Sequence, residues 1–180
     1  MLKLPYKHTS QAFISNRLDH CNSLLYGITD NLFRRVQAVQ NAAARLITGV
    51  RRHEHITPVL KQLHWLPVRQ RVHFKLAVIV FRALHGTAPS YLAEDCQLVA
   101  STDCRQLRSS TVNTCLVART STCLGDHSFA AAGLRLWNSL PTYLCQPDIS
   151  LGQFRRALDA FVSGCMTAAL SDYLLFSAII

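Results

Sequence analysis

Residues 30–49, with the sequence DNLFRRVQAVQNAAARLITG, predict a long amphipathic helix. Asp30 is a favoured helix-capping residue, and Gly49 is a favoured helix terminator. Apolar residues recur between them at helical spacing: Leu32, Phe33, Val36, Val39, Ala43, Leu46 and Ile47. The other side carries a polar stripe: Arg34, Gln37, Asn41 and Arg45. We expect the apolar stripe to face the core, and the polar stripe to face solvent, a protein groove or successive phosphates.

Similar periodicity predicts further helices on both sides of this one. Gly27 and Gly86 end two of them, Pro58 and Pro89 open two short ones, and Ser150 caps the last. Residues 106–124 lack a helical period and are rich in Thr, Ser, Val and Cys, which favours extended strands, a hairpin or irregular loop. The predicted fold is mainly α with a small β insert, and its helices span residues 9–26, 30–48, 57–63, 68–85, 89–92, 126–137 and 151–162.

These elements predict five segments along the chain. Residues 1–10 precede a basic helical subdomain at 11–95. An extended or hairpin-like insert follows at 96–125, and a second helical segment at 126–164. Residues 165–180 form an apolar tail, whose longest apolar run is about half of the roughly 20 residues that a membrane span needs.

Positive charge is concentrated in the first half of the chain. The 180 residues contain 19 Lys and Arg against 10 Asp and Glu, a formal charge of +9. Residues 1–93 hold 13 of these basic residues and only 3 of the acidic ones. From His55 to Ala93 there are five basic residues and no acid. Such a distribution suits contact with nucleic-acid phosphates, and the alternative is an ordinary solvated helix face.

Cysteine spacing and the N-terminal sequence argue against a secreted or metal-binding protein. No apolar signal segment is visible before Pro5 and Lys7, so we expect an intracellular, nuclear or cytoplasmic location. Seven cysteines are an odd number for a disulfide framework. The later cysteines contain no C-x2-C or C-x4-C pair, so we expect reduced, partly buried thiols and no metal.

No constellation of residues predicts catalysis or a cofactor. The chain lacks a nucleotide-binding glycine loop and a G-x-S-x-G nucleophile turn. The Asp-His pairs at 19–20 and 126–127 and the acidic doublet at 94–95 stand alone, so we expect them to be structural or solvated. His53 and His55 fit phosphate contacts or solvent-facing loop positions. Trp65 and Trp137 each lie near a proline, and we expect both to be core anchors.

Eight motifs in order resemble one protein family over residues 11–162. The first five are SNRLDHCNSLLYG at 15–27, VQNAAARL at 39–46, HITPVL at 55–60, LHWLPV at 63–68 and LHGTAPSYL at 84–92. The last three are LRSS at 107–110, GDHSF at 125–129 and LWNSLP at 136–141. Their order and spacing are similar to the C-terminal region of open reading frames from the jockey-like clade of non-LTR (LINE-type) retrotransposons. His20, Asp103 and Cys104 depart from the pattern, and so do residues 1–10 and the tail after Gly164.

The resemblance implies a thumb-like region that follows the palm of a reverse transcriptase, an RNA-directed DNA polymerase. The catalytic Asp-Asp motif of that family lies upstream of this region, and this chain has no Asp-Asp pair. The implied protein is a catalytically incomplete fragment that binds an RNA or RNA–DNA template–primer. Its expected phosphate contacts are Arg34, Arg45, Arg51, Arg52, Arg71 and Lys75. Two alternatives are a protein-interaction module that uses exposed apolar surface and an unselected relic of a truncated element.

Overall fold

The computed structural model of the protein is mainly helical, as the sequence predicts. It describes residues 12, 16, 17, 19, 20, 22–99 and 113–177, the last thirteen of these as helix backbone. Two compact units divide the chain, Met1–Val72 and His73–Ile180. Their boundary lies inside one helix, all of which belongs to the basic subdomain predicted from the sequence.

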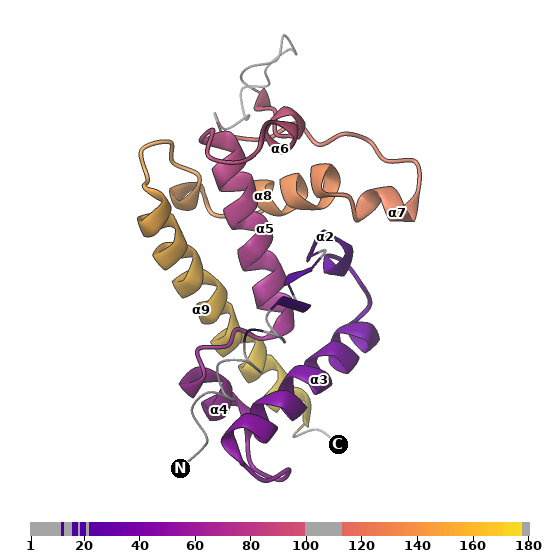
Figure 1. Ribbon diagram of the computed structural model, residues 1–180, viewed down its shortest axis with the longest axis vertical. Coiled ribbons are helices and arrows are strands. Elements are labelled where there is room, and N and C mark those ends of the chain that lie inside the picture. The colour runs from indigo at the N-terminus through magenta and orange to yellow at the C-terminus, as the bar shows by residue number, and fades with distance from the viewer. Residues whose placement is uncertain (1–11, 13–15, 18, 21, 100–112, 178–180) are drawn as a thin grey trace. The chain divides into compact units, whose positions relative to one another are not determined.

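The first unit is built around α3 (Asp30–Thr48), with the short helices α2 (Asn22–Leu25) and α4 (Ile56–Gln62) (Figure 1). The predicted bounds of α3 are confirmed, and Gly49 ends it with a φ of 74°. The prediction that Asp30 caps the helix is wrong, because Thr29 occupies the N-cap position and Asp30 lies in the first turn. Of the predicted helix at 9–26, residues 9–11, 13–15, 18 and 21 lie outside the described residues, and Gly27 follows it with a φ of 75°.

The buried face of α3 differs from the predicted apolar stripe. Phe33 and Ala44 are buried, but so is Gln40, with an exposed fraction of 1%. Val39 and Leu46, which were expected in the core, are 65% and 82% exposed. The helix is therefore rotated from the predicted orientation, and an apolar strip of its surface faces outward.

A hydrogen-bond network explains why a glutamine is buried. The Gln40 amide donates to the Leu66 carbonyl at 2.9 Å and accepts from Gln37 at 2.8 Å. Gln37 also donates to Asn41 at 2.8 Å, and its oxygen accepts from the backbone N–H of Val68 at 2.9 Å. Val68 begins the next long helix, so Gln37 satisfies one of its unpaired N–H groups. These side chains hold residues 66–68 against α3, and Gln37 and Asn41 are not a free polar stripe.

Helix α4 ends in a tight motif that buries Trp65. The backbone N–H of Trp65 donates to the Leu60 carbonyl at 2.9 Å, and that of His64 donates to the Lys61 carbonyl at 3.0 Å. This pair of bonds requires a left-handed residue after the helix, and His64 provides it with a φ of 54°. Trp65 packs with Ala44 and Leu60 in the core of this unit. The expectation that Trp65 anchors the core is confirmed.

The second unit is organised around the C-terminal part of α5 (Val68–Leu84) and α9 (Leu151–Ser177). Phe81 of α5 stacks on Phe154 of α9 with ring centroids 4.3 Å apart, and the centroid of the Trp137 ring lies 6.0 Å from that of Phe154. Trp137 is 2% exposed and is a core anchor, as expected. It belongs to α8 (Leu134–Asn138), which continues the π-helix η2 (Phe129–Gly133). The predicted helix at 126–137 therefore begins three residues later, where the Ser128 hydroxyl accepts from the N–H of Ala131.

The segments on either side of residues 100–112 pair with each other. Leu98 and Cys115 form an isolated antiparallel bridge. Beside it, the N–H of Val99 donates to the Thr114 carbonyl at 2.9 Å, and that of Leu116 donates to the Gln97 carbonyl at 2.8 Å. The Asn138 side chain exchanges two 2.9 Å hydrogen bonds with the backbone of Cys115, as a neighbouring strand would. Trp137 donates to the Asn113 carbonyl at 3.0 Å. The described ends of the insert are thus hairpin-like, and the rest of the predicted hairpin lies outside the described residues.

Three shorter elements and the end of the chain complete this unit. Helix α6 (Ser90–Asp95) follows Pro89, and α7 (Cys123–Asp126) and the 3₁₀ turn η3 (Thr142–Leu144) lie farther along. Helix α7 overlaps the end of the segment predicted to be extended, and the Thr122 hydroxyl caps it. Ser150 caps α9 through the N–H of Gln153, and the helix continues well past the predicted end at Val162. Within the described parts of the chain, no helix is long and apolar enough to cross a bilayer.

Candidate nucleic-acid interface

The end of α3 and the turn that follows it present exposed arginines. Gly49 closes the helix, and its N–H donates to the Arg45 carbonyl at 2.7 Å. The next turn is closed by Glu54, whose N–H donates to the Arg51 carbonyl and whose carboxylate accepts from the Arg51 N–H, both at 3.2 Å. These bonds use the backbone of Arg51 and leave its guanidinium at the surface. Arg52 and His53 are exposed beside it.

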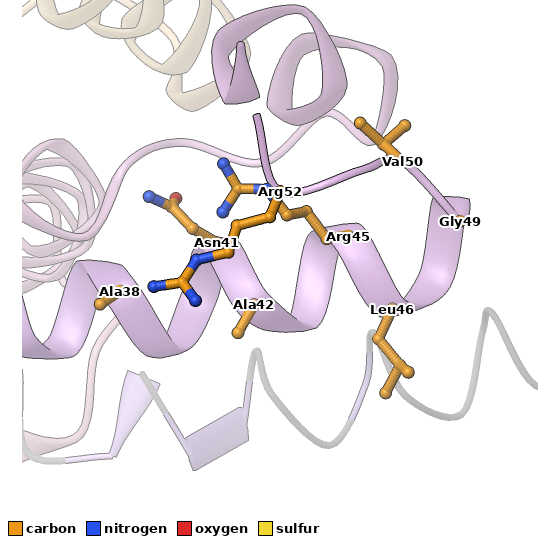
Figure 2. A pocket seen from close by; sticks show the side chains of 8 residues that line it. All are labelled: Ala38, Asn41, Ala42, Arg45, Leu46, Gly49, Val50 and Arg52. Atoms are coloured by element: carbon orange, nitrogen blue, oxygen red, sulfur yellow. The ribbon is translucent and has the colours of Figure 1, made fainter. Parts of the chain in front are cut away.

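Arg45 and Arg52 come together across a shallow groove of about 700 Å³. The other lining residues are mainly small or apolar: Ala38, Asn41, Ala42, Leu46, Gly49 and Val50. Figure 2 shows the two arginine side chains extending across α3 toward Ala38 and Asn41, whereas Leu46 points away from them. Arg45 is half-buried, and one of its terminal nitrogens lies 3.4 Å from the Glu54 carbonyl. The groove therefore has a mainly apolar floor, and its two cationic side chains come from α3 (Arg45) and from the turn after it (Arg52).

The acidic side chains described in the first unit all have partners within the chain. Asp19 receives a bidentate hydrogen bond from Arg71, at 2.6 and 2.8 Å. Asp30 pairs with Arg69, whose guanidinium also lies 4.7 Å from the centre of the Phe33 ring. Glu54 closes the turn after α3. Glu54 is the one described acid beside the arginines at the end of α3, and its single negative charge offsets only part of the charge of Arg45, Arg51 and Arg52, so this surface keeps a net positive charge.

The six predicted phosphate contacts are only partly gathered in one place. Arg34, Arg45, Arg51 and Arg52 all belong to α3 or the turn after it, and Arg34 lies about three turns before Arg45 on the same side. Arg71 has another role, because its side chain is only 15% exposed and is committed to Asp19. Lys75 is half-buried and belongs to the second unit. We therefore place the candidate interface on Arg34, Arg45, Arg51 and Arg52.

The other candidate catalytic and metal-binding residues have structural surroundings. Thr120 and Arg135 both donate to Asp126, and these hydrogen bonds, that from Thr120 first, lower the pKa of its carboxyl. Glu94 and Asp95 are exposed at the end of α6. Across the described residues, no group of three or more His, Cys, Asp or Glu side chains is placed to hold a metal ion.

Two features of the site were not predicted from the sequence. Arg35 is exposed on α3 beside Arg34 and was not among the expected contacts. The apolar groove was also missed, because Leu46 had been assigned to the core. The signal for the groove was present in the sequence, since Val39 and Leu46 are seven residues apart and so lie on one side of the helix.

Comparison of the chain with protein families, with curated proteins and with solved structures finds no match to any of them.

Proposed function

We propose that the chain is a piece of a retrotransposon-derived reverse transcriptase, from the thumb-like region that follows the palm, and that it binds the backbone of an RNA or RNA–DNA template–primer. The proposal includes no catalytic step, because the Asp-Asp pair on which the family's polymerase chemistry depends has no counterpart in the sequence. It rests first on the eight ordered motifs and second on the charge of the first unit.

The observation that carries the binding proposal is the exposure of Arg51 and Arg52 at the end of α3. Both follow a helix whose own face adds Arg34 and Arg45, and of the acids described in this unit Asp19 and Asp30 pair with other arginines, which leaves Glu54 alone beside this turn. Lys and Arg side chains bind phosphates mainly by releasing counterions, so the exposed side chains of Arg51 and Arg52 are expected to contribute most. An arginine that is already bound to a carboxylate would first have to leave it.

Charge reversal with a matched control tests this proposal. Arg51→Glu combined with Arg52→Glu is compared with Arg155→Glu combined with Arg156→Glu, because each pair is adjacent and exposed. A labelled RNA–DNA primer–template is titrated at several salt concentrations, after circular dichroism has confirmed that each variant is folded. We expect the first pair to weaken binding by about tenfold or more and to lower the salt slope by roughly two, and the second pair to change both far less.

Two results would count against nucleic-acid binding. One is a folded wild-type protein that shows no salt-sensitive affinity for the primer–template. The other is equal weakening by both variant pairs, which would mean that net charge alone is responsible. Either result would leave the chain as a protein-interaction module or as a relic without a binding role.

A further inference from the structure

One side of α3 displays the spacing of a coiled-coil seam. Positions that alternate three and four residues apart are all exposed on this helix and at its end: Leu32, Arg35, Val39, Ala42, Leu46 and Gly49. Leu32, Val39 and Leu46 are 44%, 65% and 82% exposed. Alternating spacing of three and four is the pattern by which one helix packs along another. We call these six residues the α3 seam.

The charges beside the α3 seam are of one sign. Ala38 and Arg45 immediately precede Val39 and Leu46, and Arg52 continues this row seven residues farther on, in the turn after the helix. Ala38, Arg45 and Arg52 all line the groove in Figure 2, and its lining includes no acid. In paired helices this flanking position is where opposite charges meet across the interface. The groove thus lacks the acidic half of such pairs.

We propose that the α3 seam is the docking site for an amphipathic helix of another protein, with aliphatic residues along its seam and acidic residues along its flank. The aliphatic residues cover Val39, Ala42 and Leu46, while Ala38 and Gly49 allow close approach. The acidic residues pair with Arg45 and Arg52. Arg45 has capacity for such a partner, because one of its terminal nitrogens is held by the Glu54 carbonyl at 3.4 Å, longer than a usual hydrogen bond.

Charge decides between this partner and a second copy of the chain. An antiparallel pairing of two α3 helices sets the row of Arg45 and Arg52 against the same row of the other copy, and like charges repel there. A parallel pairing of two copies sets these arginines against Val36, Ala43 and Val50, which offer no acid. Nucleic acid is also a poor occupant of the seam, because phosphates leave the exposed Val39 and Leu46 side chains uncovered.

Binding of designed peptides to the full chain tests the proposal. The probe is a labelled amphipathic peptide of about three heptads, with Leu and Ala on its seam and Glu on its flank. Two companion peptides carry Gln or Lys in place of Glu, and fluorescence anisotropy measures the affinity of each. We expect micromolar binding of the Glu peptide, binding about tenfold weaker for the Gln peptide, and weaker binding still for the Lys peptide.

Matched variants locate the contact. Leu46→Ser weakens binding of the Glu peptide by roughly tenfold to a hundredfold, since the interface loses a buried leucine. Leu124→Ser is its control, because Leu124 is 81% exposed, as Leu46 is at 82%, and lies in the other unit. Arg52→Glu reverses the preference, so that the Lys peptide binds better than the Glu peptide.

Several results would overturn the inference. Equal affinity for the Glu and Gln peptides would contradict the argument from charge. Equal loss of affinity for the Glu peptide in Leu46→Ser and Leu124→Ser would show that the peptide does not bind at the α3 seam. A wild-type dimer that dissociates in Leu46→Ser, seen by analytical ultracentrifugation, makes a second copy the occupant. The result stays separate from that of the primer–template titration, because Leu46→Ser leaves Arg51 and Arg52 in place, and a single Arg51→Glu variant, added to the titration, leaves the groove lining intact, whereas the double variant does not.

Discussion

His64 occupies a backbone conformation that suits glycine better than histidine. Its φ of 54° lies in the left-handed region, and the motif that ends α4 depends on that geometry. The strain for a residue with a side chain is roughly 1–2 kcal/mol. Glycine removes it but loses about 0.5–1 kcal/mol through its greater freedom in the unfolded chain.

We therefore expect His64→Gly to raise the free energy of unfolding by about 0.5 kcal/mol. The His64 side chain is exposed, so its removal costs little packing. Urea denaturation measures the change. Gln62→Gly is the control, because Gln62 is exposed but helical, and there glycine lowers the free energy of unfolding by about 0.5–1 kcal/mol. Equal destabilisation by both variants would mean that His64 is not strained.

At the scale of single residues, the sequence predicts which glycines end helices, but it does not predict which charged side chains pair with each other. Gly27, Gly49 and Gly86 were expected to end helices, and each has a positive φ. The identity of His64 gives no such signal. Arg71 was expected to meet phosphate because nothing local shows that its partner, Asp19, lies 52 positions earlier in the sequence. Such long-range contacts decide which charges remain available for a ligand.

At the scale of elements, the bounds of α3 were predictable and its buried face was not. Periodicity locates an apolar stripe, but α3 has apolar residues on two sides, and Gln40 lies on one of them, beside Phe33 and Ala44. The structure buries the side with Gln40, because its amide satisfies the Leu66 carbonyl. This choice depends on the path of residues 66–68, which are remote in sequence. The same rotation exposes Val39 and Leu46, so the error in the predicted core and the missed groove have one cause.

The buried network of α3 predicts a stability loss for Gln40→Met, a change that nearly keeps the side-chain volume. Gln37 and the Leu66 carbonyl then lose their partner, and we expect the free energy of unfolding to fall by about 1–3 kcal/mol. Chemical denaturation measures it, and hydrogen exchange at Val68 reports whether residues 66–68 loosen. Gln62→Met is the control, because Gln62 is exposed and its change should be close to neutral. A neutral Gln40→Met would show that the network adds no net stability.

At the scale of the whole molecule, composition and periodicity were enough for the fold class but not for the division into units. Apolar content, helix boundaries and the lack of a helical period in residues 106–124 predicted a mainly α chain with a small β insert. The boundary between units falls inside α5, where the sequence shows no break. Trp137 and Asn138 lie in the motif LWNSLP, and here they bind the backbone of Asn113 and Cys115. A motif that supports a family resemblance can therefore have a structural role.

The buried thiols make the stability of the molecule depend on pH in the alkaline range. Burial, more than neighbouring charge, raises the pKa of Cys96 and Cys145 to about 11 and that of Cys115 to about 12, from an ordinary value of 9.0. Above pH 9 the unfolded chain releases these protons while the folded chain keeps them. The unfolded state then binds fewer protons, so the free energy of unfolding falls as pH rises, by at most about 1.4 kcal/mol per thiol and pH unit.

Urea denaturation from about pH 8 to pH 10 should show this fall, and it should be smaller in Cys115→Ala. Cys123→Ala is the control, because Cys123 is exposed and its removal should leave the pH dependence unchanged. Iodoacetamide labelling mapped by mass spectrometry gives a second readout at neutral pH. The thiolate is the reacting form, so Cys123 should react before Cys96, Cys115 and Cys145 in the native protein. Labelling of Cys115 as fast as Cys123 would contradict the packing of Cys115 against Asn138, the contact that closes the insert.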